Sequence, residues 1–288
     1  MPIAVEGVSY VYMAGSPYET KALDNVNLTI EDGEFVALIG HTGSGKSTLV
    51  QHLNGLLSPT SGRVLVDGQD LAQKGTDKRA VRFRVGLVFQ YPENQLFEET
   101  VEKDIAFGPK NLGLAQEEIS RRVKDAMRRV ALSYDELSQR SVFELSGGQM
   151  RRVAIAGVLA MEPKVLVLDE PCAGLDPHGR EEILGLIRRL HAESGTTIVM
   201  VSHSMDDVAN LAERVIVMDH GTVAMDGTPR EVFSRGDRLR EMVLDVPQAV
   251  ELAEALRARG IPVPQGAYLP GEVARAILAF AGKGEEPC

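Results

Sequence analysis

The chain has 288 residues, about two average domains' worth, and 44% of them are hydrophobic, so it can bury a sizeable core. Its 41 acidic and 31 basic side chains give a net charge of −10, which excludes nucleic-acid binding through a general basic surface. No apolar run approaches the roughly 18 residues of a membrane-spanning helix, and the first residues carry no secretory signal. The two cysteines, Cys172 and Cys288, are far apart and predict free thiols of a reducing cytosol.

The first elements along the chain are predicted strands. Residues 3–12 and 26–30 alternate apolar and polar side chains, as strands of an antiparallel sheet do. Residues 35–39 are all apolar and predict a strand that is buried on both faces. This strand stops at Gly40, and a helical pattern begins near Gly45 and continues to about Leu57.

Further short apolar runs follow, and helical stretches separate most of them. This alternation predicts βαβ units and a largely parallel sheet. The runs comprise residues 64–66, 85–89, 165–168, 197–201 and 215–218.

Two segments differ from that alternation. Residues 101–131 are rich in charge and helix formers and lack strand-like runs, which predicts a helical subdomain inserted between two strands, with its charged face in solvent. Thr228-Pro229-Arg230-Glu231 forms a capping box with proline at the first helical position. Two more helices are predicted near residues 248–259 and 271–280.

A phosphate-binding loop is predicted between the strand 35–39 and the helix that follows it. Residues 40–47 read Gly-His-Thr-Gly-Ser-Gly-Lys-Ser, which satisfies the pattern G-x-x-x-x-G-K-[ST] in the structural context that the pattern requires. Its glycines let backbone N–H groups turn toward phosphates, and the helix N-terminus adds a positive dipole end. Lys46 would bridge the β- and γ-phosphates, and the Ser47 hydroxyl would bind Mg²⁺.

Two adjacent carboxylates follow the buried run 165–168. Asp169 would reach the metal ion, and Glu170 would polarise the attacking water. Apolar strands often end in acidic residues, so this pattern alone is weak evidence for a site. Together with the phosphate-binding loop it becomes strong evidence. Two adjacent acids with separate tasks indicate hydrolysis better than passive binding.

Leu145-Ser146-Gly147-Gly148-Gln149 carries a third signal. Ser146 and Gln149 stand in capping-box register before a predicted helix at residues 150–160. A cap does not need two glycines in its first turn. Glycines at a helix N-terminus expose backbone N–H groups, which suits a phosphate that approaches from another molecule.

In this order, the motifs resemble those of the nucleotide-binding subunits of ATP-binding cassette (ABC) transporters. The resemblance covers residues 1 to about 230. Gln90 matches the glutamine of the family's Q-loop, and Asp176 matches the aspartate of its D-loop. His203 matches the switch histidine, which contacts the γ-phosphate in that family.

The resemblance implies a complete site for ATP hydrolysis. Adenine would stack on Tyr12, although Tyr10 and Tyr18 lie nearby in the sequence. The implied catalytic residues are Glu170, His203, Gln90 and Lys46, and the implied Mg²⁺ ligands are Ser47, Gln90 and Asp169. The implied nucleotide-binding residues are Tyr12, Gly40, Thr42, Gly43, Ser44, Gly45, Lys46, Ser47, Thr48, Ser146, Gly147, Gly148, Gln149 and Asp176.

The implied fold class is α/β, an ABC-type P-loop nucleotide-binding domain. It combines a RecA-like, mostly parallel core with an antiparallel β subdomain and an inserted α-helical subdomain. We expect the ATPase domain at residues 1–230, its helical subdomain at about 91–160, and a small C-terminal helical domain at 231–288 that helps hold the ATPase pair together. In this family two subunits pair head to tail, so ATP would lie between Lys46 of one subunit and residues 146–148 of the other.

Residues 90–97, Gln-Tyr-Pro-Glu-Asn-Gln-Leu-Phe, are similar to those of the energy-coupling factor (ECF) transporter ATPases, including the cobalt-type ones. This resemblance implies an importer of a vitamin or transition-metal ion, with the chain bound peripherally at the cytoplasmic face of the membrane. Its implied partners are a second ATPase subunit, a transmembrane coupling subunit (T component) and a substrate-binding membrane subunit (S component). Arginines of the coupling helices would meet acidic residues near residues 91–104. The candidates are Glu93, Glu98, Glu99 and Asp104.

The sequence leaves several alternatives open. The transported substrate is one, and the identity of the second ATPase subunit, the same chain or a paralogue, is another. The chain could serve another ABC importer, for amino acids or metals. A non-transport ABC ATPase is disfavoured because the sequence lacks a second cassette, a zinc module and a long coiled coil.

Overall fold

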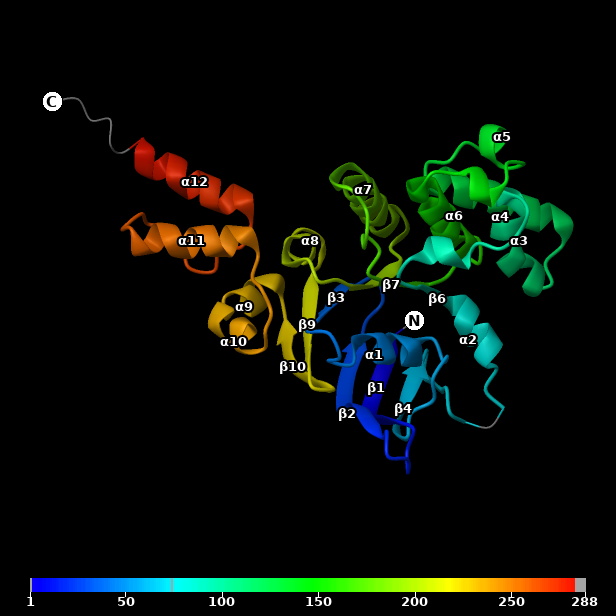
Figure 1. The fold of residues 1–288 in the computed structure, drawn as a ribbon, viewed down its shortest axis with the longest axis horizontal. Helices are drawn as coiled ribbons and strands as arrows, with labels where there is room; N and C mark the ends of the chain where they lie inside the picture. Colours follow the sequence, from blue (N-terminus) through cyan, green and yellow to red (C-terminus); the bar gives the residue numbers. More distant parts are fainter. Residues whose placement is uncertain (1, 74, 283–288) are drawn as a thin grey trace.

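The computed structural model describes residues 2–73 and 75–282 of the chain and contains two β-sheets with helices around them (Figure 1). The strands are β1 (Ile3–Tyr12), β2 (Thr20–Ile30), β3 (Phe35–Ile39), β4 (Ser61–Val66), β5 (Gln69–Asp70), β6 (Val85–Val88), β7 (Val165–Asp169), β8 (Thr197–Val201), β9 (Arg214–Asp219) and β10 (Thr222–Gly227). One sheet is antiparallel, in the order β2-β1-β4-β5. The other has the order β10-β9-β3-β8-β7-β6, and all its neighbours pair in parallel except β10 and β9.

Most of the helices pack against the two sheets, and the last two extend away from them. They are α1 (Lys46–Leu53), α2 (Lys78–Arg84), α3 (Val101–Asn111), α4 (Gln116–Arg129), α5 (Tyr134–Leu137), α6 (Gly147–Leu159), α7 (Pro177–Ser194), α8 (Met205–Leu211), α9 (Pro229–Phe233), α10 (Gly236–Glu241), α11 (Gln248–Ala258) and α12 (Pro270–Ala281). Short 3₁₀ turns lie at Pro92–Gln95 and Val142–Glu144. None of the helices in the described residues is long and apolar enough to cross a bilayer.

The central strands of the larger sheet are buried on both faces, as their apolar sequences predict. Successive side chains of a strand point to opposite faces, so β7 supplies two cores. Leu166 and Leu168 pack with α3, α4, α6 and α7, whereas Val165 and Val167 pack with α1 and the antiparallel sheet. The sheet is therefore held rigidly between two apolar layers.

The predicted helical subdomain is present between β6 and β7. Helices α3, α4 and α6 pack on one another at one end of the molecule (Figure 1). The charged side of α4 carries ion pairs at its surface, such as Arg121 with Glu118 and Glu162. The charged side chains of α4 therefore lie on a solvent-exposed face of the helix.

Some elements differ from the sequence prediction. Strand β2 begins at Thr20 because irregular pairing with β1 carries it past Asn25, where φ is +49° and the alternation breaks. Helix α1 ends at Leu53, and Asn54 and Gly55 close the turn. Strand β10 was not predicted; it pairs with β9 through a tight turn at His220-Gly221.

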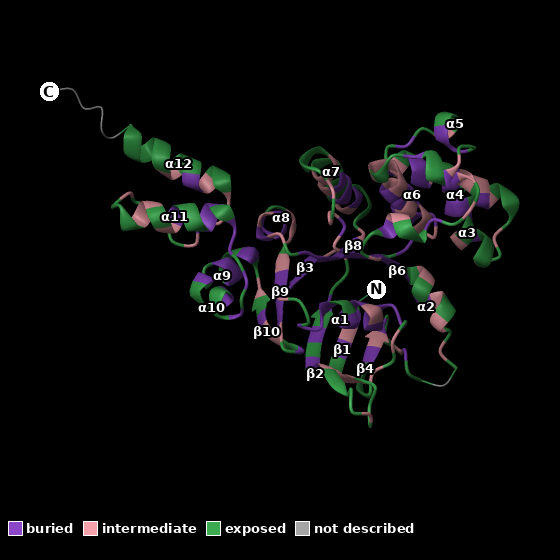
Figure 2. Ribbon diagram, viewed as in Figure 1, coloured by how far each residue is buried: buried purple, intermediate pink, exposed green. Residues whose placement is uncertain are grey.

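The C-terminal helices form two groups. Helices α9 and α10 pack against β9 and β10, and Thr228 caps α9 in the predicted capping box. Helices α11 and α12 form their own small apolar cluster and extend away from the sheets, with α12 largely exposed (Figures 1 and 2). The domain boundary at residue 230 stays a prediction.

Truncation of Leu166 tests the core between the sheet and the helices. Leu166→Ala removes a fully buried side chain, so we expect the free energy of unfolding to fall by about 2–5 kcal/mol. Urea unfolding measures the loss, with Tyr18→Ala as the control because Tyr18 is 79% exposed in the β1–β2 loop. Equal losses in the two variants would contradict this account of the core.

Candidate active site

The loop between β3 and α1 needs glycine at two close approaches. A Cβ on Gly40 would lie 2.4 Å from the carbonyl oxygen of Met218, and one on Gly45 would lie 2.6 Å from that of Ala22. Gly45 also has a φ of +104°, which other residues rarely adopt. The loop is thus packed tightly against β9 and β2 while its concave side stays open.

Lys46 begins α1 and is held by the loop itself. Its Nζ donates to the carbonyl oxygens of Gly40 at 2.6 Å and His41 at 3.0 Å. Burial lowers the pKa of Lys46, while Glu170 and Asp169 oppose that shift. No side chain caps the start of α1, and residues 45–48 line the pocket, so the first N–H groups of the helix are available to an anion.

The two carboxylates after β7 differ in their surroundings. Asp169 is buried, which raises its pKa, and the nearby Ser47 hydroxyl opposes that shift. Glu170 has a φ of +53°, an unusual conformation for a residue with a side chain. Burial, and then the charge of Asp169, raise the pKa of Glu170 to about 7.

His203, after β8, faces the second carboxylate. Its Nε2 lies 3.3 Å from Oε1 of Glu170 without hydrogen-bond alignment. In the part of the chain that the structure describes, that buried oxygen has no hydrogen-bond partner. Buried polar atoms are nearly always satisfied, so an orphaned carboxylate oxygen indicates a place for a ligand or water.

An open pocket of about 480 Å³ brings these groups together. The predicted residues that line it are Tyr12, Thr42, Gly43, Gly45, Lys46, Ser47, Thr48, Gln90, Asp169, Glu170 and His203. Thr20, Lys21, Ala22 and Val201 also line it and were not predicted. Thr20, Lys21 and Ala22 were not predicted because the alternation of apolar and polar residues starts only at residue 26. Gly40 and Ser44 belong to the loop but do not line the pocket.

The three tyrosines near the N-terminus have different surroundings. Tyr12 lines the pocket, and its hydroxyl lies 3.2 Å from Oγ1 of Thr48. Tyr10 packs edge to face against His52, and Tyr18 lies exposed in the β1–β2 loop. This arrangement favours Tyr12 as the residue for adenine stacking, although that role stays a prediction.

Two predicted groups lie outside the pocket of this chain. Ser146 and Gln149 form the predicted capping box at the start of α6, and the adjacent Gly147 leaves open space where a side chain would stand. Asp176 caps α7 by accepting from the N–H of Gly179 at 2.7 Å. Neither group lines the pocket around Lys46.

Arg151 is a residue that the sequence prediction missed. It is 1% exposed, and its guanidinium binds the carboxylate of Glu93 at 2.8 Å and the carbonyl oxygens of Pro171 and Ala173 at 3.0 and 2.8 Å. It thereby joins the start of α6 to the segments after β6 and β7. Its place four residues before buried Ile155, on one helix face, was the available signal.

The comparisons with known proteins agree with this site. The family described as ABC transporter matches residues 23–173, and the chain belongs to that family. A Clostridium perfringens protein named energy-coupling factor transporter ATP-binding protein EcfA2 is 57% identical, covering 96% of this chain and 98% of its own length. A protein of the same name from Symbiobacterium thermophilum is 59% identical, covering 96% of each chain.

Solved structures show the same architecture. CbiO1 from Clostridium perfringens, described as part of the ABC transporter complex cbiONQ, has a TM-score of 0.74 and 42% identity, covering 88% of this chain and 98% of its own. The ATP-binding cassette MJ0796, solved as a dimer in a post-hydrolysis state with ADP and Pi, has a TM-score of 0.70 and 30% identity, covering 79% and 98%. The predicted fold class, ABC-type ATPase class and resemblance to the ECF ATPases are confirmed.

Replacement of Arg151 tests whether this residue holds the start of α6 to the segments after β6 and β7. Arg151→Met strands the Glu93 carboxylate and two carbonyl groups, so we expect a loss of about 3–5 kcal/mol in the free energy of unfolding. The control is Arg128→Met, which removes an exposed ion pair with Asp125 and is expected to cost less than about 1 kcal/mol. Urea unfolding of both variants measures the difference, and similar losses would refute the role assigned to Arg151.

Proposed function

We propose that the chain is the ATP-hydrolysing subunit of an ECF-type ABC importer. The observation that carries this proposal is the single pocket that collects Lys46, Asp169, Glu170, His203 and Gln90. Relatives that match almost the whole chain, and that are named as ATP-binding proteins of such transporters, support the importer class. ATP binding and hydrolysis would drive uptake through separate membrane subunits.

The phosphates would bind at the start of α1. Backbone N–H groups of the loop and the helix would contact them, and Lys46 would exchange its bonds to the Gly40 and His41 carbonyls for phosphate oxygens. Tyr12, at the rim of the pocket, would stack on the adenine. Backbone groups and one lysine thus suffice for a polyanion in a chain of net charge −10.

The oxygens of Ser47 and Asp169 fit a magnesium ion. Both residues line the pocket, and hydroxyl and carboxylate oxygens are the ligands that Mg²⁺ prefers. Gln90 lines the same pocket and offers an amide oxygen. When bound, the ion would neutralise charge on the transferred phosphoryl group.

Glu170 is suited to act as the general base. Its Oε1 is buried and without a hydrogen bond among the described residues, and a pKa of about 7 allows it to accept a proton from water near neutral pH. Nε2 of His203 stands 3.3 Å from this oxygen, where it would contact the γ-phosphate beside the attacking water.

Completion of the site would require a second ATPase subunit, the same chain or a paralogue. Residues 146–148 sit at an open helix start outside this chain's pocket, which suits donation to a neighbour's nucleotide. A related cassette that is dimeric with ADP and Pi supports this pairing. Helix α12 exposes Ile277, Leu278 and Phe280, and we assign the C-terminal segment 231–288 to the same subunit contact.

Replacement of Glu170 tests the assignment of the base. Glu170→Gln keeps the side-chain shape but cannot accept the proton, so we expect ATP turnover to fall at least about 100-fold while ATP-bound dimers accumulate. Turnover assays and size-exclusion chromatography with ATP, with and without the partner subunits, measure both effects. The control is Glu117→Gln on the exposed side of α4. Normal turnover in Glu170→Gln would show that another group is the base.

A groove of about 530 Å³ between α2, α3 and α6 suits the transmembrane coupling subunit. Phe97 and Phe107 line it, are 57% and 44% exposed, and contact each other edge to face at 4.9 Å. A helix of the T component would cover these rings, with the S component bound beside it. This attachment would place the chain peripherally at the cytoplasmic face of the membrane.

The surroundings of the four acidic candidates favour two of them for contact with arginines of the coupling helices. Glu93 is paired with Arg151, and Asp104 is buried and accepts from the N–H groups of Phe97 and Glu98. Glu99 pairs with Lys103 at 2.5 Å. Glu98 and Glu99 therefore stay as candidates for coupling-helix arginines, with Glu98 the less engaged of the two.

Removal of the aromatic pair tests the docking groove. The double variant Phe97→Ala/Phe107→Ala removes the apolar surface, so we expect loss of co-purification with the membrane subunits and retention of ATP binding. Tyr18→Ala removes an even more exposed ring from the β1–β2 loop and serves as the control. Unchanged co-purification of the double variant would remove this groove from the proposed function.

A further inference from the structure

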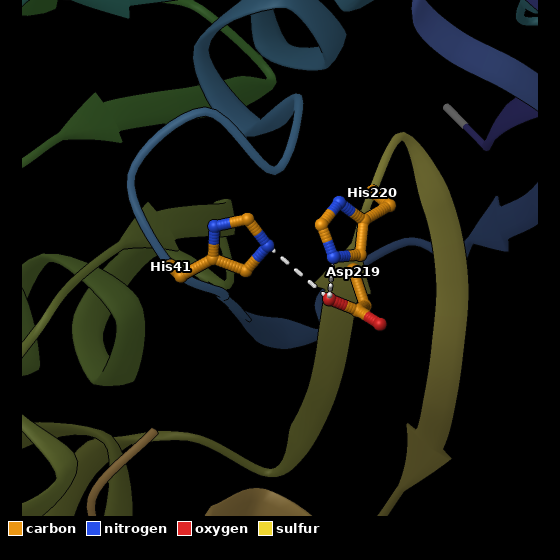
Figure 3. A group of neighbouring side chains, drawn as sticks. All are labelled: His41, Asp219 and His220. Carbon is orange, nitrogen blue, oxygen red and sulfur yellow. Dashed lines mark hydrogen bonds and ion pairs between the residues drawn. The ribbon is translucent and has the colours of Figure 1, made fainter. Parts of the chain in front are cut away.

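Two histidines and an aspartate meet beside the phosphate-binding loop. His41 belongs to that loop, Asp219 ends β9, and His220 starts the turn to β10 (Figure 3). The Oδ1 atom of Asp219 lies 3.2 Å from Nε2 of His41 and 3.7 Å from Nε2 of His220. One ligand atom from each residue lies within 4.8 Å of the other two. None of the three lines the nucleotide pocket.

The hydrogen bond of His41 fixes which of its nitrogens can bind a cation. Nδ1 lies 2.8 Å from the carbonyl oxygen of Thr42, and because a carbonyl only accepts, Nδ1 carries the proton. In the neutral ring the Nε2 lone pair then points at the carboxylate of Asp219. Two acceptors that face each other at 3.2 Å require a cation between them, a proton or a metal ion.

The arrangement favours a metal ion. Histidine ligands usually donate their other N–H to a backbone carbonyl or carboxylate, as His41 does. In a tetrahedral zinc site with bonds of roughly 2.0–2.1 Å, neighbouring ligand atoms stand about 3.3 Å apart. The two contacts of Asp219 are close to that spacing. His220 is exposed, so its ring can rotate to bring its nitrogen into place.

The backbone holds the donors in place. The N–H of Gly221 donates to the carbonyl oxygen of Ser44 at 3.0 Å, and its own carbonyl accepts from the N–H of Asp24 at 2.9 Å. The β9–β10 turn is therefore fixed against the phosphate-binding loop and β2. A metal ion bound by the three side chains would link the β9–β10 turn to the phosphate-binding loop, which the backbone hydrogen bonds already hold side by side.

We propose that His41, Asp219 and His220 bind one divalent transition-metal ion of the zinc class, with a fourth position open to water. Imidazole and carboxylate ligands suit such ions. The carbonyl of His41 also accepts from Lys46, so the ion anchors the residue that positions the phosphate-binding lysine. The site is separate from the Mg²⁺ position at Ser47 and Asp169.

Zinc titration of the intact chain in excess Mg²⁺, with a competing chromophoric chelator, tests the proposal. We expect one equivalent bound by the wild-type chain and at least a tenfold weaker affinity in His220→Ala and in Asp219→Asn. His178→Ala, which removes an exposed histidine of α7, is the control and should bind zinc as the wild type does. Circular dichroism of each variant checks that it is folded.

Two results would overturn the metal site. If the wild-type chain binds no zinc, the three side chains do not form a metal site. If His220→Ala and Asp219→Asn both bind zinc as tightly as His178→Ala, the ion binds elsewhere. A second readout is the unfolding temperature, which zinc should raise in the wild type but not in the two variants.

Discussion

The parallel pairing of β3, β8, β7 and β6 is the constraint on which the rest of the structure depends. The register places Leu38 opposite Val201 and Val201 opposite Asp169, so the carboxyl ends of these strands meet at one edge. The segments that follow them carry the phosphate-binding loop, His203, the two carboxylates and Gln90. Apolar layers on both faces prevent the strands from slipping, because a shift of one residue would turn every buried side chain around.

Burial at this edge of the sheet destabilises the charged forms of two groups of opposite sign, Lys46 and Glu170. It lowers the pKa of Lys46 and raises that of Glu170, since in each case the charged form loses water. Lys46 rests on backbone carbonyls, and Glu170 has an oxygen without a hydrogen-bond donor among the described residues. Phosphates, a metal ion and a water molecule would satisfy these groups together, so the geometry is prepared for its ligands.

Local features of the sequence were the predictable ones. The buried strands, the glycine loop and the Ser146–Gln149 capping box each depend on residues close together in the chain, and each is present in the structure. The contacts of Arg151 with Glu93 and Pro171 join segments 58 and 20 residues away, which no periodicity reveals. The cluster of His41 with Asp219 spans 178 residues for the same reason. Strand β2 started early because tertiary pairing overrode its weak alternation.

In the proposed function, these strand ends together build one site for ATP and a metal ion. Calorimetric titration with ATP, in Mg²⁺ and in a chelator, tests it most directly when the wild type is compared with Asp169→Asn. We expect Mg²⁺ to strengthen ATP binding to the wild-type chain, because Asp169 and Ser47 would both bind the ion. In Asp169→Asn, which lacks one of these ligands, Mg²⁺ should have little effect on ATP binding. The same gain from Mg²⁺ in both proteins would contradict the claim.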